Sequence, residues 1–198
     1  MAELFDVLTA KGSTIARAAS RTGASLGFKQ TALYYLSVFI EEPPSWEMDG
    51  TRIPQTKVGS LYFPDERTRD IAFVLLAGRL GVWWWGTTGD DFDVTTGLLK
   101  GFPIGPDDVG SVGDQLVALA QKLSAEQQQH PLVTKYAGKE MGNYDMSRCR
   151  HITDEADRLV LRQFDLDHLW PAVLLADASL AKVTGERPGT RREWPFPL

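Results

Sequence analysis

The chain has 198 residues, 43% hydrophobic and 24% charged, so it can form one domain with a sizeable core but is too short for two complete domains. The composition excludes a disordered or membrane-spanning chain, and the first residues lack a secretory signal, so a cytoplasmic location without membrane contact is expected. A net charge of −5 argues mildly against a dedicated DNA-binding module. One cysteine, Cys149, excludes an internal disulfide bond, and with three separated histidines it predicts no metal site.

The N-terminal part combines a weak helix, a loop and a strand. Residues 4–19 have a weak helical pattern, and the Gly, Ser and Thr content of residues 20–27 predicts a loop. Residues 28–40 are rich in Phe, Tyr, Leu and Val, which favours a strand. All charged residues between positions 7 and 40 are basic, so a local positive face is expected on an acidic protein.

The middle of the chain predicts a strand followed by a buried helix. Residues 57–63 have the composition of a short strand. Asp65 and Glu66 then begin a helix, because acidic side chains are favourable in the first turn. The helix is apolar on nearly every side, so we expect it to lie between other elements. A polar, glycine-flanked loop is predicted over residues 86–90.

The C-terminal part predicts further helices around one strand. Ser111 and Asp114 have the spacing of a capping box at the start of an amphipathic helix. Residues 132–136 are expected to form a strand, and residues 137–143 a loop. Another helix is predicted to begin near Thr153, and a last one follows it.

These elements predict an α+β fold in which a small mixed sheet packs with several helices in a single domain. We expect an N-terminal helical and loop segment over residues 1–27 and the α+β domain over residues 28–184. Residues 185–198 have no periodicity and are expected to form a disordered tail.

Three of the six tryptophans stand side by side at positions 83–85. Three consecutive side chains cannot all point the same way on a helix or a strand, so at least one must meet something other than its own core. All three can be core or subunit-interface residues. An exposed indole could instead stack on a base, which makes Trp83, Trp84 and Trp85 candidate base-stacking or interface residues.

The same stretch carries a family resemblance, spread over Leu75-Leu76-Ala77-Gly78-Arg79-Leu80, the tryptophans, Thr88-Gly89-Asp90-Asp91-Phe92-Asp93-Val94-Thr95 and Phe102-Pro103-Ile104. It resembles the C-terminal target-recognition region of N6-adenine DNA methyltransferases and fused type II restriction-modification enzymes, some of them in phage-defence systems. The resemblance extends over residues 28–170. It implies that the chain grips double-stranded DNA around the adenine to be modified.

The chain lacks the chemistry of a whole methyltransferase. It has no glycine-rich loop for S-adenosylmethionine and no Asn/Asp-Pro-Pro-aromatic motif; its one Pro-Pro, at 43–44, follows Glu42 and precedes Ser45. No lysine has an acidic residue two positions before it, as a nuclease motif often requires. The resemblance therefore implies a non-catalytic part, with S-adenosylmethionine on a partner chain. That partner would be a catalytic methyltransferase subunit or the upstream half of a split enzyme.

The candidate DNA contacts are polar or cationic residues near aromatic ones, in stretches that predict loops. They are Lys29, Thr87, Thr88, Lys135, Lys139, Tyr144, Arg148 and Arg150. The alternative is a small protein–protein interaction module that docks through its tryptophan-rich face without touching DNA. Salt dependence separates the two, because phosphate contacts weaken steeply with added salt.

Overall fold

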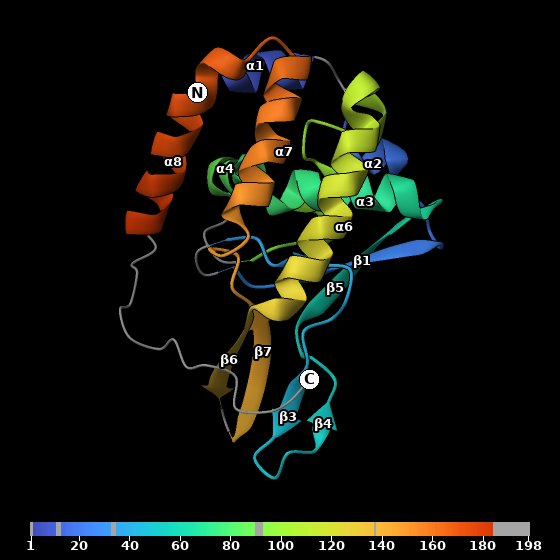
Figure 1. Cartoon of the computed structure of the whole chain (residues 1–198), viewed down its shortest axis with the longest axis vertical. Helices are drawn as coiled ribbons and strands as arrows, with labels where there is room; N and C mark the ends of the chain where they lie inside the picture. The colour runs from blue at the N-terminus through green and yellow to red at the C-terminus, as the bar shows by residue number, and fades with distance from the viewer. Residues whose placement is uncertain (1, 11–12, 33–34, 90–92, 137, 184–198) are drawn as a thin grey trace.

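Helices gather at one end of the molecule and two small antiparallel sheets lie toward the other (Figure 1). The computed structural model describes residues 2–10, 13–32, 35–89, 93–136 and 138–183. The helices are α1 (Ala2–Ala10), α2 (Ile15–Ala18), α3 (Glu66–Ala77), α4 (Arg79–Thr88), α5 (Thr96–Lys100), α6 (Gly113–Gln129), α7 (Arg150–Gln163) and α8 (Trp170–Val183). Short 3-10 turns are η1 (Pro106–Asp108), η2 (Gly110–Val112) and η3 (Asp167–Leu169).

The first sheet, in the order β2-β1-β5, lies beneath α3. It consists of β1 (Ala24–Lys29), β2 (Val38–Phe39) and β5 (Val58–Phe63), and β1 pairs antiparallel with both neighbours. Leu26 stands opposite Leu61, and both are buried. Directly opposed residues share a sheet face, so such pairs form the apolar side that packs against the helix.

Helix α3 is the centre of the core, as its sequence predicts. The Asp65 carboxylate accepts a hydrogen bond from the Thr68 amide at 2.7 Å, which confirms the predicted helix start. Every residue from Asp70 to Ala77 is buried, because α6, α4, α7 and the first sheet surround the helix. The prediction of a helix buried on nearly all sides is confirmed.

The second sheet, in the order β4-β3-β7-β6, projects away from the helices (Figure 1). Its strands are β3 (Ser45–Glu47), β4 (Arg52–Ile53), β6 (Pro131–Tyr136) and β7 (Lys139–Tyr144). Polar contacts join β7 of this sheet to the connecting segments beside the first sheet: Gln55 Nε2 donates to the carbonyls of Pro43 and Gly142, and Ser37 Oγ donates to Asn143 Oδ1 at 2.6 Å. These bonds fix the projecting sheet to the core.

The α+β class is confirmed, while several element boundaries differ from the predictions. The loop predicted over residues 20–27 is wrong for its last four residues, because β1 begins at Ala24. The strand predicted over residues 28–40 shrinks to the end of β1 and the two residues of β2. The loop predicted over residues 137–143 is largely β7, since pairing with β6 supplies the backbone hydrogen bonds.

Helix starts also differ from their predictions. Val112, not Ser111, stands at the start of α6 and makes no side-chain cap, so the predicted capping box is wrong. Helix α7 begins at Arg150, ahead of Thr153. Leu4 and Ile15 lie in the common core, so the segment over residues 1–27 packs with the rest. The tail predicted over residues 185–198 lies outside the described residues. None of the described helices is long and apolar enough to cross a membrane.

Candidate nucleic-acid interface

The tryptophan triplet belongs mainly to the core. It lies in α4, where Trp83 and Trp85 are each only 3% exposed, so neither ring can stack on a base in this structure. Trp84 is half-buried, and its indole N–H donates to the Leu98 carbonyl at 3.0 Å. The exposed Phe5 stacks on Trp84 with ring centroids 6.3 Å apart. Trp84 is the partly exposed ring of the three, but it also packs against the core, so the expectation that one indole meets something other than the core stays a prediction.

The two threonines after the triplet lie on helix, not loop. Helix α4 continues to Thr88, so the first three residues of the loop predicted over residues 86–90 are helical. Thr87 Oγ1 donates to the Trp83 carbonyl at 2.9 Å, and Thr88 Oγ1 to the Trp84 carbonyl at 2.7 Å. Both hydroxyls are exposed at the surface but are used to satisfy the last turn of the helix.

Lys29 and Tyr144 lie in or near the seam between the two sheets. The Lys29 ammonium donates a hydrogen bond to Gln55 Oε1. Partial burial lowers the pKa of this ammonium to about 8, although the negative charge of Glu42 raises it. Tyr144 is 4% exposed and donates its hydroxyl to the Glu41 carbonyl at 3.0 Å. Burial raises the pKa of Tyr144 to about 12. Both residues therefore support the attachment of the projecting sheet.

Arg150 and Arg148 have different surroundings. Arg150 Nη2 lies 3.3 Å from Asp177 Oδ1, which also faces the Arg79 guanidinium. Arg79 in turn makes two hydrogen bonds to Asp154, at 2.7 and 3.1 Å. This network ties α4, α7 and α8 together, so Arg150 is a structural residue here. Arg148 is exposed just before α7.

Lys135 and Lys139 stand on the β6–β7 hairpin of the projecting sheet. Lys135 Nζ lies 3.0 Å from Glu140 Oε1, and Lys139 Nζ lies 3.4 Å from Glu47 Oε1. Lys135 on β6 stands directly opposite Glu140 on β7. Lys139 stands opposite Tyr136, in the next cross-strand pair. Because successive residues of a strand point to opposite faces, the hairpin carries one lysine on each face.

A cross-strand row on this sheet includes residues that the sequence did not single out. In register, Lys135 stands opposite Glu140, Glu140 opposite Trp46, and Trp46 opposite Arg52. Directly opposed residues share a face, so one side of the sheet presents two cations, a half-buried indole and a buried carboxylate. Trp46 and Arg52 lie about 80 positions from the hairpin in sequence, and their approach depends on strand pairing.

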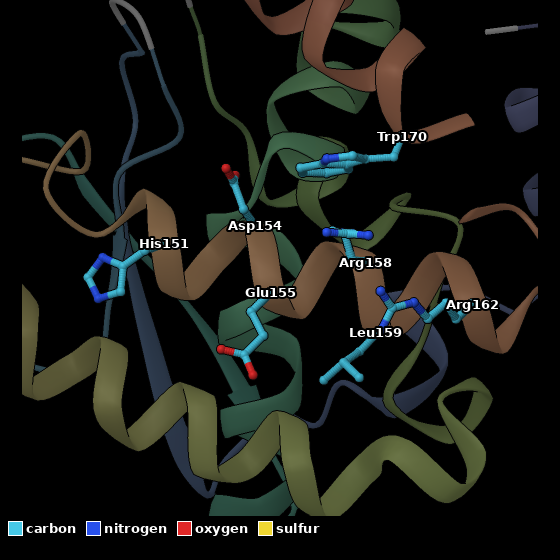
Figure 2. A pocket seen from close by; sticks show the side chains of 7 residues that line it. All are labelled: His151, Asp154, Glu155, Arg158, Leu159, Arg162 and Trp170. Atoms are coloured by element: carbon cyan, nitrogen blue, oxygen red, sulfur yellow. The ribbon is translucent and has the colours of Figure 1, made fainter. Parts of the chain in front are cut away.

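A second polar surface follows the outer side of α7. A groove of about 350 Å³ is lined by His151, Asp154, Glu155, Arg158, Leu159, Arg162 and Trp170. Figure 2 shows the Trp170 indole lying over the guanidinium of Arg158. The groove-lining residues of α7 recur at helical spacing, so they share one side of the helix. The opposite side of α7 is buried in the core. The spacing of Arg158 and Arg162 is visible in the sequence, but the position of Trp170 is not.

Behind this groove, Asp157 caps the start of α4 from a neighbouring helix. It is 2% exposed, and its Oδ2 accepts a hydrogen bond from the Arg79 amide at 2.6 Å. Burial raises the pKa of Asp157 to about 7, and Asp154 adds to the effect, whereas the amides of Arg79 and Leu80 and the charge of Arg150 oppose it. A Cβ on Gly78 would lie 2.3 Å from Oδ1, so glycine is required beside this carboxyl.

No protein-family model, curated protein or solved structure matches the chain. The resemblance to methyltransferase target-recognition regions therefore stays a prediction. In the described part of the chain, no group of three or more His, Cys, Asp or Glu could hold a metal ion. Of the acidic residues Asp90, Asp91 and Asp93, only Asp93 lies within the described residues.

Proposed function

We propose that this chain is a DNA-contacting specificity module of an adenine-specific DNA methyltransferase or of a restriction-modification or phage-defence system. It is non-catalytic alone and acts with a catalytic partner that binds S-adenosylmethionine. The observation that carries the proposal is the projecting β6–β7 hairpin, which has Lys135 and Lys139 on opposite faces. The sequence resemblance supports it independently.

The hairpin forms one side of the four-stranded sheet, with β6 as its edge strand, and a pair of antiparallel strands is one of the elements that fit the major groove of duplex DNA. A ribbon in a groove has a sugar–phosphate backbone on either side, so a lysine on each face suits phosphate contact on both. Trp46 and Arg52 extend the Lys135 face across the sheet. The hydrogen bonds made by Gln55 and Ser37 hold the sheet rigidly enough to fix its register on DNA.

Titration of a fluorescent DNA duplex at several salt concentrations tests the proposal. The wild-type chain should bind with an affinity that falls steeply as salt rises. The Lys135→Gln/Lys139→Gln variant should bind more weakly, and the slope of log K against log salt should decrease by about 1 to 2, since each phosphate contact contributes about 0.9.

Lys122→Gln is the matched control, because Lys122 is exposed on α6, away from the hairpin. It should leave both affinity and slope unchanged. Equal effects of the control and the double variant would refute the hairpin as the contact, and salt-independent or absent binding would refute the function.

The second candidate is a protein-docking module without DNA contact. Two of the three tryptophans are buried, so a docking face at this place reduces to Phe5 and Trp84, which stack on each other. Phe5 is 39% exposed, so its ring is available for an apolar contact there. A Phe5→Ser variant that loses a salt-insensitive complex while keeping its fold would support this function.

A further inference from the structure

We propose that the groove along α7 is a binding site for a phosphate group, held by the guanidinium groups of Arg158 and Arg162 beside Trp170. The site lies on a different element from the β6–β7 hairpin, and the inference does not depend on DNA contact by that hairpin. None of these three residues is in the motifs that carry the resemblance or among the predicted DNA contacts.

The donor geometry is the first argument. Both arginines turn their Nε atoms toward Asp167 Oδ1, at 3.7 Å from Arg158 and 3.4 Å from Arg162. These distances exceed those of ordinary N–H···O hydrogen bonds. Among the described residues, neither arginine forms a hydrogen bond or ion pair with any residue other than Asp167, and Trp170 lies against only one face of Arg158, so the terminal Nη groups of both remain available as donors. Paired guanidinium ends of this kind are suited to the oxygens of phosphate.

The helix provides the spacing and the rigidity. Arg158 and Arg162 are four positions apart on α7, which places them on the same side of the helix, one turn apart. The opposite side of the same two turns buries Val160 and Leu161 in the core. Each guanidinium is about half exposed, so a ligand can reach it without a change in the backbone.

The charges around the groove favour an anion of limited size. Asp154 is neutralised by two hydrogen bonds from Arg79, so it does not oppose an anion. Asp167 pairs with both arginines at once. Besides Asp154, the acidic residue that lines the groove is the exposed Glu155. A phosphate would therefore compete with Asp167 for the arginines and avoid the end of the groove at Glu155.

Trp170 indicates what else the ligand carries. Its indole lies over Arg158 at the edge of the groove (Figure 2), and the space of about 350 Å³ is large enough for more than an inorganic ion. A flat aromatic wall next to guanidinium donors fits a phosphate joined to a ring system, as in a nucleotide. The phosphate can belong to a free nucleotide or to the end of a polynucleotide.

Quenching of tryptophan fluorescence measures the binding. The probes are inorganic phosphate, adenosine monophosphate and a short single strand of deoxythymidylate with or without a 5′-phosphate. The wild-type chain should bind the phosphate-bearing probes, and Trp170→Phe should remove most of the fluorescence change. Arg158→Gln/Arg162→Gln should lower the affinity at least about tenfold, because two charge-assisted contacts are lost.

Two comparisons separate a binding role from a structural one. Asp167→Asn should raise the affinity, since it removes the carboxylate that competes for the arginines. Arg67→Gln is the control, because Arg67 also forms a surface pair, with Asp114 at 2.6 Å, but lies on α3. If the double variant fails to fold, the single variant Arg162→Gln provides the test, because the Arg162 side chain is about half exposed.

The outcomes decide both the site and its ligand. Tighter binding of the nucleotide than of the phosphorylated strand supports a free nucleotide, and the reverse supports a polynucleotide end. Absence of binding by every probe, or equal binding by the wild type and the folded arginine variants, overturns the proposal. Weaker binding by Asp167→Asn also overturns the proposal, because the role of the two arginines would then be the structural one of pairing with Asp167.

Discussion

Substitution of the buried Asp157 by asparagine should change how the stability of the protein depends on pH. The carboxyl is 2% exposed and accepts a hydrogen bond from the Arg79 amide, where α7 meets the start of α4. Asp154 and Arg150 on α7, Arg79 on α4 and Asp177 on α8 form the charged surroundings. Asparagine has nearly the same shape and keeps an oxygen acceptor for the amide, but it cannot ionise.

The sign follows from the direction of the pKa shift. Burial raises the pKa of Asp157 in the folded protein from 3.8 to about 7. Between these values the folded state holds a proton that the unfolded state has released, so the free energy of unfolding falls as pH rises from about 4 to about 7. A difference of about 3 pKa units corresponds to roughly 4 kcal/mol at pH 7 and above.

Urea unfolding of the wild type and Asp157→Asn at pH 5, 6, 7 and 8, at constant ionic strength, measures the effect. Between pH 5 and pH 8 the variant should gain about 2–3 kcal/mol of stability relative to the wild type, because the wild type has already lost about 1–2 kcal/mol of the total at pH 5. Asp157→Ala should be less stable at every pH, by about 1–3 kcal/mol relative to asparagine, since it leaves the buried Arg79 amide without an acceptor. Parallel curves for the wild type and the asparagine variant would refute a protonated Asp157.

Two further predictions concern packing. Gly142→Ala should destabilise the fold by about 3 kcal/mol, because an added Cβ would lie 1.9 Å from the Pro44 carbonyl oxygen. Gly97→Ala on α5 should be neutral or stabilising, because the nearest atom to its added Cβ is 3.8 Å away. Thermal unfolding of the two variants compares these effects. Trp84→Phe should cost about 1–2 kcal/mol, since it breaks the bond to Leu98, while Trp85→Phe should stay within about 1 kcal/mol of the wild type. Within the described part of the chain, the buried Trp85 indole N–H has no hydrogen-bond partner, so its removal offsets part of the lost packing. A larger loss from Trp85→Phe than from Trp84→Phe in urea unfolding would contradict this reasoning.

The elements that could be predicted are those in which local signals and tertiary packing agree. Helix α3 has an acidic cap at Asp65 and an apolar run, and both features survive in the fold. Strand β5 matches its predicted span to within one residue. In contrast, β7 contains Lys, Glu, Gly and Asn, which are poor strand formers, and it exists because β6 and β3 pair with its two edges.

The surroundings of the charged residues could not be read from the sequence, because they depend on register and turns. Lys139 meets Glu47 through the pairing of β3 with β7, across more than 90 positions. Trp170 reaches the α7 groove because the chain reverses at Asp165, a non-glycine residue with φ 60°. Asp tolerates this left-handed conformation, but nothing in its local sequence demands it.

The salt bridges of the projecting sheet make its two lysines unequal as phosphate ligands. Exposed ion pairs contribute little, about 0–1 kcal/mol, so Lys139 can leave the half-exposed Glu47 at small cost when a phosphate is near. Glu140 is 6% exposed, and removal of Lys135 would leave a buried carboxylate without its cation. Lys135 therefore mainly neutralises Glu140, and Lys139 is the more available phosphate contact. If the hairpin contacts DNA, Lys139→Gln alone should account for most of the affinity lost by the double variant.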